Sequence, residues 1–233
     1  MRLKHTRIAT TLAATLALVT GYASAAVLVN TGFETDGIAA NDFANITPTS
    51  WTGYGPGGKY VGDGNVFAGI SGANSGDQYF LAYVSSTFTV SQIRQDSTLL
   101  WSNMTVGDSL TISAYTTYRS DTNGAANTYF WLNDTDAADN LGLNSAAINV
   151  TDVAAGAWTL RTWTYTITQP ILDTAISDGW GAVEVGLGIV KTAAADDQQV
   201  AFDDVSLVHT AIPEPSAALL GGLGMLCLLR RRR

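Results

Sequence analysis

Cysteine and histidine are nearly absent from this sequence. Its 233 residues contain one cysteine, Cys227, and two histidines, His5 and His209. Because Cys227 lies close to the C-terminus, the body of the chain can form no disulfide, has no cysteine nucleophile and offers no thiolate to zinc. His209 would have to serve alone in a Ser-His-Asp triad or in a histidine-ligated metal site. We therefore expect an apolar core to hold the chain together, without a catalytic centre of these kinds.

Basic residues are also scarce. Residues 26–211 contain 19 acidic residues and five basic ones, which gives this body a formal charge of −14. Nucleic-acid phosphates attract clusters of lysine and arginine and repel a surface of this sign. Binding to DNA or RNA is therefore excluded, whereas the many carboxylates remain available to hard cations such as calcium.

The first 25 residues have the three parts of a secretory signal peptide in order. Residues 2–7 include three basic side chains, and residues 8–21 are apolar or small and carry no charge. Ala23 and Ala25 then fit the small-x-small pattern that signal peptidase requires. We expect an exported protein whose N-terminal signal helix is removed by signal peptidase after Ala25.

The body, residues 26–211, is long enough for one sizeable domain, and its hydrophobic pattern has a period of two. In SLTISAYTTYR (residues 109–119) and GAVEVGLGIV (residues 181–190), apolar side chains alternate with polar ones or glycine, as in half-buried strands. Clusters such as GDGN and SDTNGAAN are typical of the turns between strands. No long helical pattern appears in the body. We predict an all-β domain, an antiparallel β-sandwich, flanked by the signal helix and a short C-terminal membrane helix.

The C-terminus combines an apolar run with a basic cluster. Residues 216–229 carry no charge, and the chain ends with Arg230, Arg231, Arg232 and Arg233. A helix of this length spans roughly 21 Å, less than the roughly 30 Å hydrocarbon layer, but it can insert if the bilayer thins. The arginines would then stay on the cytoplasmic side. We expect the precursor to be held transiently in the inner membrane by this segment.

The triplet Pro213, Glu214 and Pro215 precedes this run. Together with the short apolar helix and the terminal arginines, it resembles the PEP-CTERM sorting segment of proteins exported by Gram-negative bacteria that build exopolysaccharide. The resemblance covers residues 212–233. It implies recognition of the triplet by an exosortase, a membrane protease-transpeptidase, and delivery to the cell surface or extracellular matrix. The alternative is a plain C-terminal anchor that contains Pro-Glu-Pro by chance.

Two short motifs in the body carry a second resemblance. NTGFE at residues 30–34 and DDVSL at residues 203–207 resemble the first and last strands of jelly-roll carbohydrate-binding modules. This resemblance implies a jelly-roll sandwich and a structural calcium ion that ties Glu34 to Asp203 or Asp204. The apolar alternation of the last strand also changes phase across these two aspartates, and a β-bulge there would restore it. The alternative to calcium is a solvated aspartate pair beside an ordinary bulge.

The segment NTYFWLN, residues 127–133, supplies candidate ligand contacts. Sugar rings stack on aromatic side chains, while amides and carboxylates bind their hydroxyl groups. Phe130 and Leu132 alternate with Tyr129 and Trp131, so only one of the two pairs can face the core. We predict an exposed aromatic-polar strip made of Asn127, Tyr129, Trp131 and Asn133. The alternative is that Tyr129 and Trp131 are the core pair.

These observations lead to one hypothesis with two alternatives. The hypothesis is an exported, non-enzymatic β-sandwich that associates with matrix polysaccharide. One alternative is a structural or adhesion protein of the matrix without a specific glycan. The other is a secreted enzyme that acts on glycosides, for which two carboxyl groups must face each other across a cleft. The body has only two glutamates, Glu34 and Glu184, and Glu184 faces outward among glycines on its expected strand.

Overall fold

The computed structural model describes residues 22–25, 27–39, 42–54, 59–62, 69–70, 72–119, 127–134, 143–192 and 197–212. One compact unit spans Ala23–Ile212, close to the expected body. Most of the predicted signal peptide and the whole predicted sorting triplet, apolar run and arginine cluster lie outside the described residues. Within the described residues, no helix is both long enough and apolar enough to cross a membrane.

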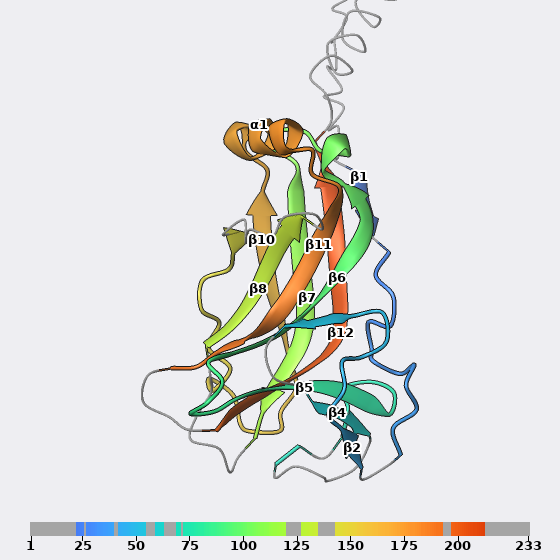
Figure 1. Ribbon diagram of the computed structural model, residues 1–233, viewed down its shortest axis with the longest axis vertical. Coiled ribbons are helices and arrows are strands. Elements are labelled where there is room, and N and C mark those ends of the chain that lie inside the picture. The colour runs from blue at the N-terminus through green and yellow to red at the C-terminus, as the bar shows by residue number, and fades with distance from the viewer. Residues whose placement is uncertain are drawn as a thin grey trace, which may run out of the picture. The chain divides into compact units, whose positions relative to one another are not determined.

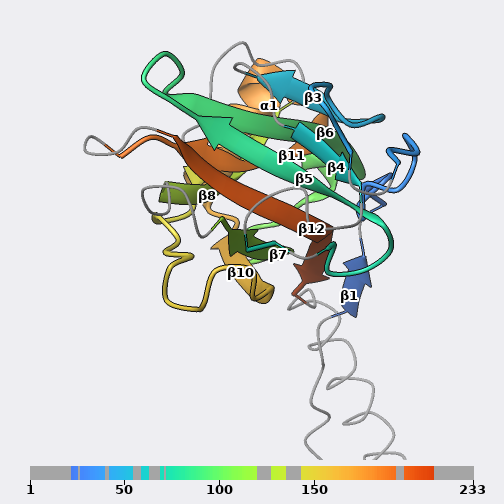
Figure 2. The same ribbon diagram turned by 90° about the horizontal axis from the view of Figure 1, so that it is seen from below.

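The described strands form two antiparallel sheets, as expected for a β-sandwich (Figure 1). The seven-stranded sheet has the order β10 (Thr159–Thr166), β7 (Ser109–Tyr118), β12 (Gln198–Ala211), β5 (Gln78–Val84), β4 (Lys59–Gly62) and β2 (Phe43–Ala44), and β1 (Tyr22–Ala25) also pairs with β12. The five-stranded sheet has the order β3 (Thr52–Tyr54), β6 (Val90–Leu100), β11 (Ala182–Val190), β8 (Asn127–Asp134) and β9 (Leu143–Asn144). Ala23 and Ala25, the residues of the expected cleavage site, therefore lie in a paired strand, which Figure 2 shows beside β12.

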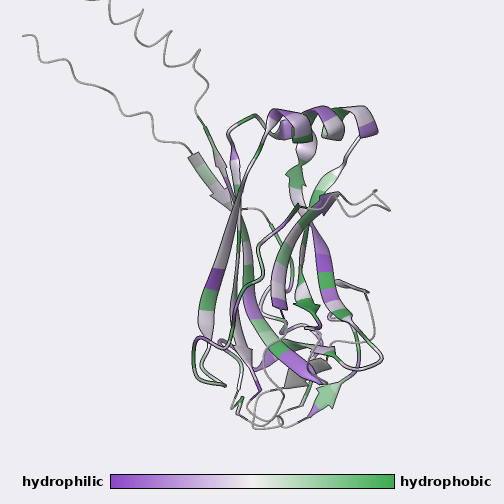
Figure 3. Ribbon diagram, turned by 90° about the vertical axis from the view of Figure 1, so that its left-hand side faces the viewer, coloured by the Kyte–Doolittle hydropathy of each residue, from purple (hydrophilic) through white to green (hydrophobic). Residues whose placement is uncertain are grey.

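The core lies between the two sheets and is built by alternation. Hydrophobic and hydrophilic residues alternate along several strands (Figure 3), as the period of two in the sequence predicted. β7 contributes Leu110, Ile112 and Ala114 to the main hydrophobic cluster, and the opposite sheet contributes inward residues of β11 and β8. Phe130 and Leu132 of β8 are fully buried members of this cluster. On the outer face of the seven-stranded sheet, a second, smaller cluster buries Ile70, Tyr79, Leu81 and Ala201.

A β-bulge restores the phase of β12. The register between β12 and β7 shifts between Asp203 and Ser206, and Asp204 adopts a left-handed conformation with φ of 49°. As a result, apolar residues on both sides of the bulge reach the same core: Val200, Phe202, Val205 and Leu207. The expected bulge is thus present. It leaves the side chain of Asp203 fully buried.

One short α-helix, α1 (Gln169–Asp178), covers an end of the sandwich (Figure 1). It buries Leu172 and Ala175 and ends at Gly179, whose φ of 69° suits a left-handed C-cap. The N–H of Trp180 donates a hydrogen bond to the carbonyl of Ala175, and the Trp180 ring packs edge-on against Trp101 in the 3₁₀ helix η1 (Trp101–Asn103). The helix therefore closes the core at one end.

Candidate ligand-binding trough

Two glycines lie in the outward row of the central strand β11 in the five-stranded sheet. Residues directly opposite each other in an antiparallel pair point to the same side. The registers of β11 with β6 and β8 therefore set two rows across this face, Arg94–Gly186–Trp131 and Gln92–Gly188–Tyr129. The central strand has no side chains at these positions, yet both glycines are buried, and Trp131 lies against Gly186. We call this strip of the outer face, between the side chains of β6 and β8, the trough. Gly188 cannot be replaced without movement, since a Cβ there would lie 2.3 Å from the carbonyl oxygen of Ser91.

Tyr129 and Trp131 form one wall of this trough. Their ring centroids are 6.0 Å apart, with an interplanar angle of 35°. The two rings lie on the face opposite to the core, as predicted, but only Tyr129 is partly exposed. Trp131 is 6% exposed, so the expectation of an exposed tryptophan platform is wrong. Part of its side chain lies against Gly186, where a Cβ would lie 3.4 Å from both Cβ and Cε3 of Trp131.

A third row, Asp96–Glu184–Asn133, closes one end of the trough. Glu184 is 5% exposed, and its Oε1 accepts hydrogen bonds from Arg94 Nη1 at 3.5 Å and from Asn133 Nδ2 at 3.3 Å. Burial raises the pKa of Glu184, while the nearby Arg94 and Asn133 oppose that rise. Both hydrogen bonds are longer than ordinary ones, so they hold the carboxyl group only weakly.

Two polar atoms in these rows have no hydrogen-bond partner among the described residues. They are Nε of Arg94 and Oδ1 of Asn133, and both atoms are buried. A buried donor or acceptor left unpaired costs stability, so such atoms point to a missing partner. One atom donates and the other accepts. A hydroxyl group can pair with either.

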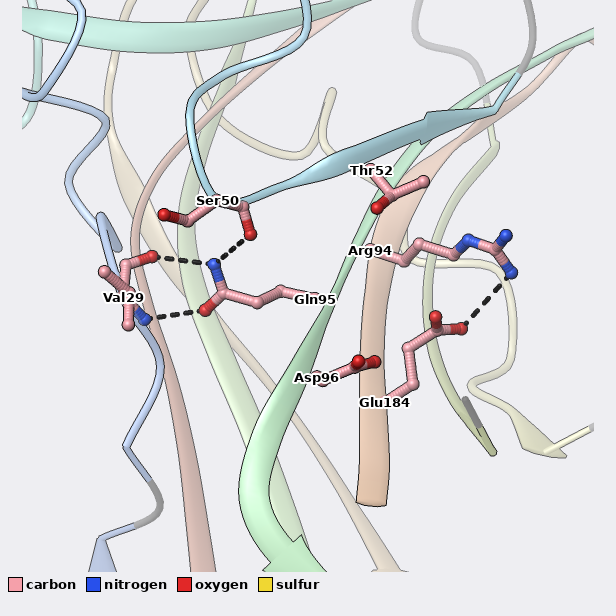
Figure 4. A pocket seen from close by; sticks show the side chains of 7 residues that line it. All are labelled: Val29, Ser50, Thr52, Arg94, Gln95, Asp96 and Glu184. Atoms are coloured by element: carbon pink, nitrogen blue, oxygen red, sulfur yellow. Dashed lines mark hydrogen bonds and ion pairs between the residues drawn. The ribbon is translucent and has the colours of Figure 1, made fainter. Parts of the chain in front are cut away.

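A recess of about 340 Å³ lies beside Glu184 (Figure 4). Its lining residues are Val29, Ser50, Thr52, Arg94, Gln95, Asp96 and Glu184. The Gln95 side chain points away from Asp96 and Glu184 and holds the opposite wall of the recess in place (Figure 4). Its amide accepts a hydrogen bond from the N–H of Val29 at 2.6 Å and donates to the carbonyls of Val29 at 2.9 Å and Ser50 at 2.6 Å. The recess is therefore walled by backbone that the β6 side chain holds in place.

The structure also brings together the three predicted metal ligands. Glu34, Asp203 and Asp204 meet around Gly32. A Cβ added to this glycine would lie 3.5 Å from Asp204 Oδ1, 3.8 Å from Asp203 Oδ1 and 3.9 Å from Glu34 Cγ. We call these three carboxyl groups, with the segment Asn74–Gln78 that they contact, the clasp.

Hydrogen bonds occupy the carboxylates of the clasp. Asp203 Oδ2 accepts from the N–H groups of Asn74 at 2.8 Å and Ser75 at 3.0 Å, and Oδ1 accepts from the N–H of Asp204 at 2.8 Å. Asp204 accepts from side-chain atoms of Asn74 and Ser75, at 2.8 Å and 2.6 Å. Glu34 Oε1 accepts from two further backbone N–H groups, both at 3.0 Å, those of Asp77 and Gln78. The clasp thus joins the N-terminal segment, the loop before β5 and the bulge of β12.

An oxygen-only set of carboxylates has suitable chemistry for calcium. Yet in the part of the chain that the structure describes, no three acidic, histidine or cysteine side chains converge as ligands of one ion would. Burial and the neighbouring charge of Asp204 raise the pKa of Asp203 to about 7, although hydrogen bonds from Ser75, Asp204 and Asn74 oppose the rise. Calcium in the clasp therefore stays a prediction, and the hydrogen bonds already explain why the loop is held.

His209 forms a pair that sequence reasoning missed. Its Nε2 lies 2.9 Å from Oδ2 of the buried Asp108. Burial alone would raise the pKa of Asp108, but hydrogen bonds from the N–H groups of Ile212 and Thr105 and from His209 outweigh that effect, and the pKa is lowered. These bonds fasten the end of β12 to the turn before β7, a structural role that explains the histidine without catalysis.

The fold is shared with solved structures of known proteins. No protein-family model matches the chain, and no curated protein matches it significantly. A Stig cyclase, Fisc, from Fischerella sp. TAU, solved in complex with an indole compound, is 14% identical, covers 82% of this chain over its own full length, and has a TM-score of 0.63. An apo cyclase from Fischerella sp. gives 15% identity and a TM-score of 0.62, over 82% of this chain and 98% of the cyclase.

Carbohydrate-binding modules are also among the structural neighbours. The CBM22-1 xylan-binding domain of Xyn10C from Paenibacillus barcinonensis is 15% identical, and the match covers 75% of this chain and 98% of that domain. Its TM-score of 0.40 is too low to carry an argument about the ligand. The cyclase matches support the β-sandwich fold, and a fold alone does not determine function.

Proposed function

We propose that this chain is an exported protein that binds a glycan in the trough without acting on it. The observation that carries the proposal is that a partly exposed ring, Tyr129, lies on the same sheet as a recess lined by the carboxyl groups of Asp96 and Glu184 and by Arg94, whose side chain is 37% exposed. Sugars present apolar C–H faces for stacking and hydroxyl groups that both donate and accept hydrogen bonds. The trough offers a partner to each kind of group.

The contacts divide between residues that touch the ligand and residues that support them. Tyr129 supplies the stacking surface, and Trp131 backs it, because the tryptophan is buried against Gly186. Arg94 supplies guanidinium donors and Asp96 an acceptor to sugar hydroxyls in the recess, while Asn133 supports Glu184 through its hydrogen bond. Glu184 accepts further hydroxyl donors at the closed end of the trough.

Binding assays on single-ring variants test this proposal. The wild-type body should bind polysaccharide of the same organism's matrix, and Tyr129→Ala should weaken binding at least tenfold by removing stacking area. Tyr115→Ala is the matched control, because Tyr115 is a partly exposed ring on the other sheet. Equal losses in both variants would show that Tyr129 is not the stacking residue. No glycan binding by the wild type on an array that includes the matrix polysaccharide would support a structural or adhesion protein instead.

We further propose that the protein reaches the cell surface or matrix of a Gram-negative bacterium through signal peptidase and exosortase. The support is the ordered sequence of signal peptide, Pro213-Glu214-Pro215, apolar run and arginines. Intact mass spectrometry of the surface form should show loss of residues 1–25 and of the arginine-ended tail. Substitution of Glu214 should leave the precursor in the inner membrane, and a surface form that still ends in Arg230–Arg233 would contradict sorting.

A catalytic role is the second candidate. Glu184 is a buried carboxyl group with a raised pKa that lines a recess, and such groups can act as acids. The TM-score of 0.63 shows that cyclases can be built on a sandwich of this kind. Incubation of matrix oligosaccharides and indole compounds with wild type and Glu184→Gln would decide between the roles. Product formation by the wild type alone would make the protein an enzyme; binding without product would support the first proposal.

A further inference from the structure

One end of the sandwich carries exposed apolar side chains. At the end that α1 covers, β6 and β12 finish and β7 begins (Figure 1). Exposed large apolar residues lie there on α1, directly after β12, in the turn before β7 and at the end of β6: Ile176, Ile212, Val106 and Leu100. Ile176 is 75% exposed and Ile212 is 46% exposed, so neither is needed to close the core. Exposed apolar residues that gather in one place mark interaction sites, whereas scattered ones do not.

The elements that carry these residues are bonded or packed to one another. The N–H of Ile212 donates to Oδ1 of the buried Asp108 at 2.9 Å, and a Cβ added to Gly107 would lie 2.6 Å from Cδ1 of Ile212. The N–H of Gly107 in turn donates to the carbonyl of Ile167, just before α1, at 2.9 Å. We call this surface the apolar end, and it consists of Leu100, Val106, Ile176 and Ile212.

The chain leads from the apolar end towards the expected membrane segment. Ile212 is the last described residue, and the uncharged run begins at Ser216. A chain spans at most about 3.6 Å per residue, so the four steps between these residues cover about 14 Å or less in any conformation. When the run is inserted in a bilayer, the apolar end therefore lies close to the lipid surface.

The charges near the apolar end favour an apolar contact over an electrostatic one. Asp173 and Asp178 of α1 accept hydrogen bonds from Gln169 and Ser177. The five basic residues of the body lie in β4, within β6, after β7, in β10 and after β11: Lys59, Arg94, Arg119, Arg161 and Lys191. Anionic lipid headgroups attract basic side chains, and aspartates repel them. A contact with lipid must therefore come from the apolar side chains.

We infer that the apolar end lies against the lipid surface while the precursor is held in the inner membrane, an inference that rests on the proposed sorting route. Ile176 and Val106 contact the boundary between headgroups and acyl chains. The inserted tail keeps the effective concentration of this surface at the membrane high, so a few apolar side chains suffice. The contact holds the triplet Pro213-Glu214-Pro215 at the membrane surface, and removal of the tail releases the body.

Quenching of single fluorescent dyes by lipid tests this contact. In the full chain, a dye on the native Cys227 reports on the uncharged run. In Cys227→Ser chains the dye is placed at Ile176→Cys or, as the matched control, at Phe88→Cys. Phe88 is a 38% exposed apolar residue just before β6, a strand whose ten steps span about 33 Å at roughly 3.3 Å per residue and end at the apolar end.

The labelled chains are reconstituted into vesicles of phosphatidylethanolamine and phosphatidylglycerol that contain lipids spin-labelled just below the headgroup. The label at position 176 should be quenched about threefold or more above the label at position 88. Equal quenching at these two positions, with the Cys227 label quenched, would overturn the contact and leave membrane insertion intact. A Cys227 label that is not quenched would instead overturn insertion of the tail, on which the proposed sorting route depends.

A charge placed on the apolar end should break the contact. With the dye at Val106→Cys, Ile176→Asp should reduce quenching about twofold or more, because a carboxylate is costly to bring into the lipid boundary. Phe88→Asp is the matched control and should leave quenching unchanged. Both side chains are exposed, so neither change disturbs the core. Quenching that is unaffected by Ile176→Asp would overturn the part of α1 in the contact.

Discussion

The trough and the clasp each contain a buried carboxyl group, and they hold it in different ways. In the clasp, Asp203 accepts three backbone hydrogen bonds of 2.8–3.0 Å and lies under a loop. In the trough, Glu184 accepts two bonds of 3.3 and 3.5 Å from side chains, and unpaired polar atoms lie beside it. Burial raises the pKa in both places.

The difference indicates a structural role for Asp203 and a ligand-binding role for Glu184. Fixed backbone donors at ordinary distances use up the acceptor capacity of Asp203, so this group holds the fold together. Long bonds to mobile side chains leave the capacity of Glu184 partly unused, and a ligand can take it up. We therefore expect the free energy of unfolding to depend on the clasp and ligand binding to depend on the trough. Trp131 is the exception, because it lies in the trough and its burial also contributes to stability.

Trp131→Ala should have the largest effect on stability. Its side chain is 6% exposed, and deletion of a buried tryptophan costs about 3–5 kcal/mol through lost contacts and the cavity left behind. Tyr129→Ala is the comparison within the same wall and should cost under about 1 kcal/mol, because its ring is partly exposed. Urea unfolding of both variants measures the two costs. Equal losses of stability would mean that the wall is a single packed unit and that Tyr129 is not the accessible ring.

Asp203→Asn should have the next largest effect. The amide cannot accept all the hydrogen bonds from Asn74, Ser75 and Asp204, and a buried N–H left unpaired costs about 1–3 kcal/mol. Glu184→Gln is the matched change in the trough and should cost under about 1 kcal/mol, since its partner Arg94 is exposed enough to be solvated. Denaturant midpoints at pH 7 compare them. A larger loss for Glu184→Gln would reverse the division between clasp and trough.

The fold was largely predictable from the sequence because alternation is a local signal. β7, β8 and β11 bury the residues that a period of two selects, and even the bulge of β12 was visible as a phase change between Phe202 and Val205. The same alternation predicted that Tyr129 and Trp131 lie on the face opposite to the core.

The site was less predictable, because burial on an outer face depends on neighbouring strands. Trp131 is covered in part because Gly186 lies opposite it, a register between residues more than 50 positions apart in the chain. The register between β6 and β11 also brings Arg94, Asp96 and Glu184 together, and no local sequence pattern predicts this arrangement. The pairing of Asp108 with His209 likewise spans 101 residues. Outward glycines beside an aromatic on a neighbouring strand are the signal that could have located the trough.

A calcium ion in the clasp would increase the stabilisation that its hydrogen bonds provide, and it would leave the trough unaffected. Binding to the folded state alone would stabilise it by about 2.7 kcal/mol at a hundredfold excess over the dissociation constant. A chelator should then lower the melting temperature of the wild type, and Glu34→Ala should remove that sensitivity. The trough variant Glu184→Gln should keep it. An identical melting curve with and without chelator would show that hydrogen bonds alone hold the clasp.

The pH dependence of stability reports the protonation of the buried carboxyl groups in the clasp and the trough. An unfolded aspartate has a pKa of about 3.9, whereas burial raises the pKa of Asp203 to about 7 in the folded protein. Between these values the folded state binds more protons than the unfolded state, so the free energy of unfolding falls as the pH rises from about 4 to 7 and levels off above. Asp203→Asn should reduce this slope.

The pKa of Glu184 is also raised, so its contribution to the slope has the same sign, and Glu184→Gln should remove part of the remaining slope. Urea unfolding in chelator at several pH values measures both contributions, since a bound cation would keep Asp203 ionised. A wild-type stability that does not fall between pH 5 and 7 would mean that Asp203 is already ionised in the folded clasp.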